Sequence, residues 1–401
     1  MHSKKILMPV VLAGLGAASA AQALDVGSST TVGGLAYLDF SDIQQKQNGL
    51  DYPVPPPAAT APVSGSGVGF DVKRAYLIVD HKFDSVWAAN ITTDAQYDTN
   101  SKVGEIFIKK FYLQATLSDA LVLHAGSYDN PWIPFAEAQY GYRYVEKLTL
   151  DRLGYGNTTD WGVSASGQFS HNLVNYAIAV INGNGYKNPS RSKYVDEEMR
   201  VGINPVNWLT IGLGYYNGHL GQVTQSSADY ARNTASRLDL LLAVHWKGLR
   251  VGGEYFEAKN FKLGSATTGA LGADIVATNA VVVNGVVTNP GTAPVSDEAA
   301  GYSGWASYNF TPQWAVFGRY DTTKPSKHVD TGLQDTFYNL GVAFKPIPPI
   351  DLALVYKNER VTDGVVSISG GDAGSAYTIG GINAKTDGSY EEIGLYAQFR
   401  Y

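Results

Sequence analysis

The connections between its alternating segments constrain this chain more than any other feature of its sequence. Sixteen segments alternate apolar and polar residues, and this period of two is typical of strands with one apolar and one polar face. The segments span 30–40, 70–83, 86–98, 103–117, 120–128, 158–170, 172–182, 194–204, 208–218, 234–247, 249–259, 300–310, 313–321, 335–345, 350–360 and 389–401.

Short and long connections alternate along the chain. The short turns fall at 84–85, 118–119, 171, 205–207, 248, 311–312 and 346–349, and the other connections are mostly long loops. A soluble sandwich also has strands of period two, but tight turns at one end and long loops at the other are typical of a transmembrane barrel. We therefore predict an all-β transmembrane antiparallel β-barrel of about 16 strands, with short periplasmic turns and long extracellular loops.

Aromatic residues gather near both ends of the predicted strands, where amphipathic rings meet the two membrane interfaces. Those near the short turns are Trp87, Phe169, Trp246, Phe310, Trp314, Phe344, Phe399 and Tyr401. Those near the long loops are Tyr97, Phe107, Tyr215, Tyr255, Tyr302 and Tyr356. Their clustering at strand ends supports a barrel that spans lipid.

Residues 1–23 have the pattern of a cleaved export signal. Lys4 and Lys5 precede an apolar stretch, and residues 21–23 (Ala-Gln-Ala) fit a small-x-small cleavage site. We predict a signal peptide over 1–23 and a barrel domain over 24–401, located in the bacterial outer membrane. The absence of Cys from the whole sequence suits an exported envelope protein and excludes disulfides and thiolate metal sites.

The sequence lacks the patterns typical of enzymes and metal centres. The seven His form no His-Glu-x-x-His pair, and there is no Gly-x-Ser-x-Gly nucleophile turn or Gly-Lys-Ser/Thr phosphate loop. We predict no enzyme activity, no catalytic residue, no metal and no cofactor. An outer-membrane hydrolase is the enzyme alternative.

The alternation also assigns the charged residues that would line the pore. The basic ones are Arg74, Lys110, Arg200, Arg250 and Arg319, with Lys345, Lys357 and Arg400. The acidic ones are Asp94, Glu198, Asp239, Glu254, Asp321, Glu359 and Glu392. Because rings of charge set ion preference, this near balance of signs predicts weak selectivity, whereas the net charge of −6 is a poor guide because outer loops and lumen both contribute to it.

The short-and-long alternation and the terminal strand ending in residues 398–401 (Gln-Phe-Arg-Tyr) resemble those of sixteen-stranded outer-membrane porins. A narrower resemblance, to the phosphate-selective porin family (O and P type), rests mainly on residues 70–170. Its motifs here are Val72-Lys73-Arg74-Ala75-Tyr76-Leu77, Leu123-His124-Ala125-Gly126-Ser127-Tyr128 and Pro131-Trp132-Ile133-Pro134-Phe135. Members of that family are expected to line their channel with many Arg and Lys, and this acidic chain departs from that pattern.

The resemblance implies a passive channel for small hydrophilic or anionic solutes and ions, with phosphate as a candidate. It implies a homotrimer in outer-membrane lipid, and no nucleic-acid partner is expected. The third long loop, residues 129–157, would fold into the barrel as the pore-constriction loop, with its charges at Arg143, Glu146, Lys147, Asp151 and Arg152. The alternative is that this loop lies across the extracellular mouth.

Two further functions stay open at this level. A surface barrel could act as an adhesin or phage receptor through its long loops 41–69, 260–299 and 361–388. A plugged transporter needs an N-terminal plug domain, whereas only residues 24–29 precede the first predicted strand of the mature chain. A passive channel is therefore the preferred prediction.

Overall fold

The computed structural model describes a chain whose placed residues are 24–25, 29–47, 49–51, 66–98, 103–189, 191–223, 234–265, 271–272, 281–283, 286–289, 294–369, 377–380 and 387–401. The expected signal peptide lies outside the described residues, so that assignment and the limits of the mature domain stay predictions.

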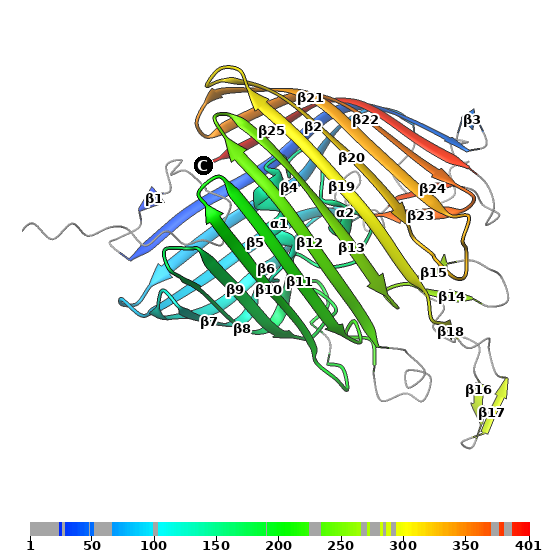
Figure 1. Ribbon diagram of the computed structural model, residues 1–401, viewed down its shortest axis with the longest axis horizontal. Helices are drawn as coiled ribbons and strands as arrows, with labels where there is room; N and C mark the ends of the chain where they lie inside the picture. Colours follow the sequence, from blue (N-terminus) through cyan, green and yellow to red (C-terminus); the bar gives the residue numbers. More distant parts are fainter. Residues whose placement is uncertain are drawn as a thin grey trace, which may run out of the picture.

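Sixteen long antiparallel strands form a closed barrel (Figure 1). Each pairs with the next in chain order, and β25 pairs with β2 along 13 residues, which closes the ring. The barrel strands are β2 (Thr30–Gln47), β4 (Gly67–Lys82), β5 (Trp87–Asp98), β6 (Val103–Ser118), β7 (Leu121–Asp129), β8 (Thr159–Phe169), β9 (Val174–Ile181), β10 (Asp196–Val206), β11 (Leu209–Gly218), β12 (Ala235–Trp246), β13 (Leu249–Lys259), β19 (Glu298–Asn309), β20 (Trp314–Lys324), β21 (Gln334–Ile347), β22 (Ile350–Thr362) and β25 (Gly388–Arg400). The predicted fold class is thus confirmed.

The remaining elements belong to the ends of the barrel and its loops. Two helices, α1 (Ile133–Tyr140) and α2 (Thr149–Arg152), follow β7. Short strands pair with β2 or with one another: β1 (Leu24–Asp25), β3 (Leu50–Asp51), β14 (Leu263–Ser265), β15 (Leu271–Gly272), β16 (Val281–Val283), β17 (Val286–Asn289), β18 (Pro294–Val295), β23 (Val365–Ile368) and β24 (Tyr377–Gly380). None of the described helices is long and apolar enough to cross a membrane.

The alternating sequence becomes an apolar exterior and a polar interior. On β12, Leu238, Leu240 and Leu242 are 40–54% exposed, while Asp239 between them is fully buried inside the barrel. A closed ring pairs the backbone groups of every strand edge, which a hydrocarbon environment requires. The large apolar side chains on the outside therefore form the surface that contacts lipid.

The tight turns have local causes in the sequence. Between β12 and β13, Lys247 and Gly248 both have positive φ (47° and 82°), as a two-residue type I′ hairpin requires. After β4, the carboxylate of Asp84 accepts hydrogen bonds from the backbone N–H groups of Val86 and Trp87, both at 2.7 Å. These turns hold neighbouring strands in register at the periplasmic end.

The limits predicted for one of three long loops are wrong. Strand β2 continues through Gln47 and β4 begins at Gly67, so the loop predicted over 41–69 is shorter. The reason is that strand ends above the lipid are polar on both faces, so their sequence resembles that of loops. The limits predicted for the other two loops, 260–299 and 361–388, agree with the structure to within two residues. Short strands lie inside both, β14–β18 in the first and β23 and β24 in the second.

Two of the β-bulges in the barrel have a lysine as the extra residue. Tyr37 pairs with Arg74 and Leu38 with Val72, so Lys73 is the extra residue on β4. Thr92 pairs with Lys110 and Thr93 with Ile108, so Lys109 is the extra residue on β6. Because a bulge interrupts the period of two, each strand turns two consecutive basic side chains away from lipid.

Candidate pore constriction

The segment between β7 and β8 lies inside the barrel. Figure 1 shows α1 and α2 enclosed by the ring of strands. The side chains of Trp132, Ile133 and Leu150 are at most 1% exposed. The backbone N–H of Trp132 donates to Glu198 on β10, 66 residues away in the sequence, at 3.1 Å. The segment therefore packs against the inner wall.

Two glycines on β11 make room for this packing. Gly212 and Gly214 occupy consecutive inward positions on the strand. A Cβ atom on Gly212 would lie 2.6 Å from the ring of Phe135, and one on Gly214 would lie 2.5 Å from the ring of Trp132. Because any side chain at these positions would collide with the loop, these glycines allow its close approach.

The far end of α1 is held by the wall near a tight turn. The guanidinium of Arg250 donates to the carbonyl of Tyr140 at 3.1 Å, and Nε2 of His245 lies 3.3 Å from the carbonyl of Gln139. The helix has no basic residue in its own last turn, so Arg250 of the wall supplies the positive charge that a helix C-terminus favours. These residues adjoin the turn at Lys247-Gly248, so the loop reaches the periplasmic half. The alternative position across the mouth is wrong.

Three arginines join the loop to the wall in what we call the buried arginine cluster. Arg152 forms ion pairs with Asp335 (2.8 Å) and Glu359 and lies 4.5 Å from the ring of Phe337. Arg237 binds Asp239 (2.9 Å), Glu198 (3.0 Å) and the carbonyl of Tyr155 (2.7 Å). Arg319 binds Asp321 and donates to the carbonyl of Lys147 and to Thr149.

The opposite side of the loop has a second group of charges. Arg143 pairs with Glu137 at 2.5 Å and with Asp151 at 3.3 Å. Nζ of Lys147 contacts Asp151 at 3.2 Å and Oγ of Ser369 at 3.1 Å. Burial lowers the pKa of Lys147 to about 8. Burial opposes ionisation of Asp151, but Lys147 and Arg143 outweigh it and lower the pKa of that carboxyl.

Exposure separates the two groups of charge. In the buried arginine cluster, the paired side chains are only 0–2% exposed. We call the other set the water-accessible pairs, whose side chains are 10–17% exposed: Lys73 with Asp71, Lys110 with Asp129, Arg143 with Glu137, and Lys147 with Asp151. Carboxylates outnumber cations in the buried cluster, which also holds Glu254 at 4% exposure. They do so again around Lys73 and Lys357, which pair with Asp39, Asp71, Glu146 and Glu392. Part of the barrel's excess acid is thus enclosed between loop and wall.

The predicted site residues are therefore only partly brought together. Arg143, Lys147 and Asp151 form one network, and Glu146 pairs with Lys357 at 3.1 Å. Arg152 instead points into the wall. The predicted pore-lining residues all face inward: Arg74 pairs with Asp94, Lys110 with Asp129 and Arg319 with Asp321, whereas Arg200 and Arg250 bind loop carbonyls.

The sequence did not lead us to predict that the two bulge lysines, Lys73 and Lys109, face inward. Nζ of Lys109 lies 2.7 Å from the hydroxyl of Tyr76 and 4.6 Å from its ring centre. Lys73 pairs with Asp39 at 3.2 Å. The available signal was a pair of adjacent basic residues in a membrane strand, because strict alternation would place one of each pair in lipid.

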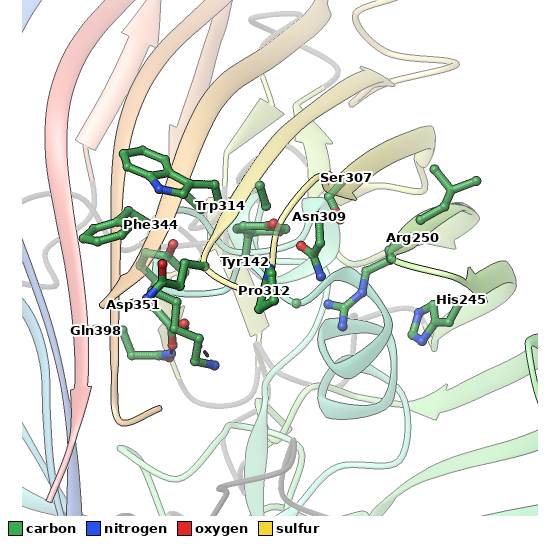
Figure 2. A pocket seen from close by; sticks show the side chains of 18 of the residues that line it. Tyr142, His245, Arg250, Ser307, Asn309, Pro312, Trp314, Phe344, Asp351 and Gln398 are labelled. Atoms are coloured by element: carbon green, nitrogen blue, oxygen red, sulfur yellow. Dashed lines mark hydrogen bonds and ion pairs between the residues drawn. The ribbon is translucent and has the colours of Figure 1, made fainter. Parts of the chain in front are cut away.

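A cavity of about 520 Å³ opens below the loop at the periplasmic end (Figure 2). Tyr142, stacked on Phe317 with ring centres 4.0 Å apart, lines it together with Arg250 and Asp351. Arg400 and Lys345 both pair with Asp351, at 3.1 and 3.4 Å. Within the described ranges, no group of His, Asp or Glu side chains is arranged to hold a metal ion.

No protein-family model and no curated protein sequence matches this chain. Solved structures do match it. The anion-selective porin from Comamonas acidovorans is 11% identical, with a TM-score of 0.59 over 92% of this chain and 99% of that chain. The outer-membrane channel DcaP of Acinetobacter baumannii is 11% identical, with a TM-score of 0.55 over 93% and 97%. Salmonella typhi OmpF, in a complex with daunomycin, is 7% identical, with a TM-score of 0.55 over 93% and 98%.

At these identities the similarity establishes the fold. It is the closed sixteen-stranded barrel of bacterial outer-membrane porins, and this chain shares both its strand pairing and its apolar exterior. None of these three structures is described as a phosphate-selective porin. With its lipid-facing surface and closed ring, the protein is an outer-membrane β-barrel.

Proposed function

We propose that this protein is a passive diffusion channel, not an enzyme, for small hydrophilic solutes, and that it prefers anions. The main support for this proposal is that arginines of the wall hold a charged loop inside a closed barrel. A loop that packs on one side of the wall narrows the lumen without an energy source or a cofactor. Arg143, Lys147, Glu146 and Asp151 then provide the charges that a passing solute meets.

The distribution of charge supports a preference for anions. A simple count of inward residues gave near balance, but six of the inward carboxylates, against three arginines, are enclosed in the buried arginine cluster. Three other inward cations, Lys109, Arg200 and Arg250, have no carboxylate within ion-pair distance among the described residues. A nearby charge acts more strongly than a distant or screened one. The attraction of these side chains for permeating anions therefore exceeds the attraction of the enclosed carboxylates for permeating cations.

Two finer parts of the proposal are phosphate as a solute and a homotrimer. The motifs around Arg74 and His124 support phosphate. The resemblance to sixteen-stranded porins supports the homotrimer. Native mass measurement in detergent tests the trimer, and a monomer would contradict it.

The channel is tested by conductance in planar bilayers under a KCl gradient. We expect discrete ion-permeable steps and a reversal potential on the chloride side of zero. Phosphate should reduce the chloride current if phosphate is a bound solute, and an unchanged current would reject that solute. A bilayer with inserted protein and no conductance would overturn the channel and favour a surface receptor.

A matched pair of variants tests the anion preference. Lys109→Gln removes an inward cation that forms no ion pair with any residue the structure describes, and should move the reversal potential toward potassium. Lys324→Gln removes an exposed lysine at the last position of β20 and should leave it nearly unchanged. Equal effects of the two variants would contradict an origin of selectivity in the lumen.

A further inference from the structure

The hairpin formed by β23 and β24 folds back into the extracellular end of the barrel. Val366 and Ile368 of β23 and Ile379 of β24 are 3%, 1% and 0% exposed, while the alternate residues Val365 and Ser367 are exposed. The buried three belong to the same apolar cluster as the inward side chains of Ile43, Val361 and Tyr390, on β2, β22 and β25. One face of the hairpin therefore packs on the inner wall.

The residue that follows β23 reaches the constriction loop. The backbone N–H of Ser369 donates to the carbonyl of Arg152 at 2.7 Å, and its hydroxyl donates to the carbonyl of Asp151. The same Oγ accepts a hydrogen bond from Nζ of Lys147 at 3.1 Å. The last carbonyls of a helix have no partner within it, so Ser369 satisfies the end of α2.

We infer that this hairpin is a second part of the constriction and that Ser369 is a positioning residue for Lys147 and Asp151. The inference rests on the proposed channel function and extends it to a segment more than 200 residues further along the chain. Packing of Ile368 brings the hairpin down onto α2. Ser369 then holds Lys147 and Asp151, one of the water-accessible pairs, in position through its hydroxyl.

The first test compares three serine variants in planar bilayers. Ser369→Ala removes the hydroxyl that binds Lys147 and Asp151, so conductance and reversal potential should both shift. Ser369→Thr keeps a hydroxyl and should restore wild-type values. Ser367→Ala removes a hydroxyl from the exposed face of the same hairpin and should change neither quantity.

The second test separates the whole hairpin from its last residue. Ile368→Asp places a charge in the buried apolar cluster and should unseat the hairpin, which increases conductance. Val365→Asp places the same charge on the exposed face and is the control. Heat-dependent mobility on detergent gels verifies that each variant forms a barrel.

The outcomes distinguish this inference from the proposed function. A wild-type protein without conductance refutes the channel itself. A conducting wild type, with Ser369→Ala and Ile368→Asp both indistinguishable from it, overturns the role of the hairpin. A threonine variant that behaves like Ser369→Ala overturns the role of the hydroxyl.

Discussion

Titration of Lys147 should change the ion preference of the channel between neutral and alkaline pH. Burial lowers its pKa to about 8, so about nine-tenths of the side chains are protonated at pH 7 and about one-tenth at pH 9. In the protonated state, Arg143 and Lys147 balance Glu137 and Asp151. Loss of the proton leaves one net negative charge, so preference should shift toward cations as pH rises through about 8.

Coulomb's law sets the size of this shift. A unit charge 4 Å from a passing ion contributes about 1 kcal/mol at the dielectric constant of water and about 4 kcal/mol at an effective value of 20. The smaller figure already corresponds to about a fivefold change in the local concentration of an ion of one sign. Because the screening length falls from about 10 Å at 0.1 M salt to about 3 Å at 1 M, the shift should be largest at low salt.

The assay is the reversal potential at fixed KCl gradient between pH 6 and pH 10. Lys262 must be controlled, because burial also lowers its pKa to about 8. In the variant Lys262→Gln the reversal potential should still change in a step near pH 8. In the double variant that also carries Lys147→Gln, this step in the reversal potential should disappear. Persistence of the step in the double variant would refute the assignment, as would its complete loss in Lys262→Gln alone.

Two further predictions concern stability. Arg152→Gln leaves Asp335 and Glu359 buried without their cation and should lower the stability of the docked loop by about 3–5 kcal/mol. The control Arg360→Gln changes a side chain that is 66% exposed and should lower stability by at most about 1 kcal/mol. Limited proteolysis of the folded barrel measures loosening of the loop, and equal susceptibility of the two variants would contradict the buried cluster. Leu240→Arg on the lipid face should cost about 2–4 kcal/mol if it lies near the bilayer midplane. A urea titration in lipid vesicles measures this loss of stability. In the same titration Ser307→Arg, at a position that faces the cavity, should cause little loss. Equal losses for the two variants would contradict the assignment of Leu240 to the lipid face and Ser307 to the lumen.

The strand pattern was predictable because lipid acts on every strand in the same way. Each spanning strand must present apolar side chains outward, so the alternation in Leu238–Trp246 and Ile393–Phe399 is visible without any knowledge of partners. The end of β2 beyond Phe40 was missed because that requirement weakens above the membrane. Lys73 and Lys109 were missed because a bulge depends on the register of two strands, which a single segment does not reveal.

The candidate site was less accessible to sequence reasoning. The charges of the loop were identified, but their partners lie on strands far along the chain, such as Glu359 for Arg152 and Lys357 for Glu146. Assignment to the inner face did not reveal which acids the loop would enclose. Small inward residues such as Gly212 and Gly214 were a usable signal, since they mark where another segment contacts the wall.

The position of the constriction loop in the chain has a consequence for the order of folding. Its principal wall partners, from Glu198 on β10 to Glu359 on β22, all follow it in the sequence, by up to 211 residues. Contacts between such distant residues form late, because long stretches of chain must be ordered first. We therefore expect the loop to dock only as the second half of the barrel closes around it, so that a nascent barrel remains wide until the final strands pair.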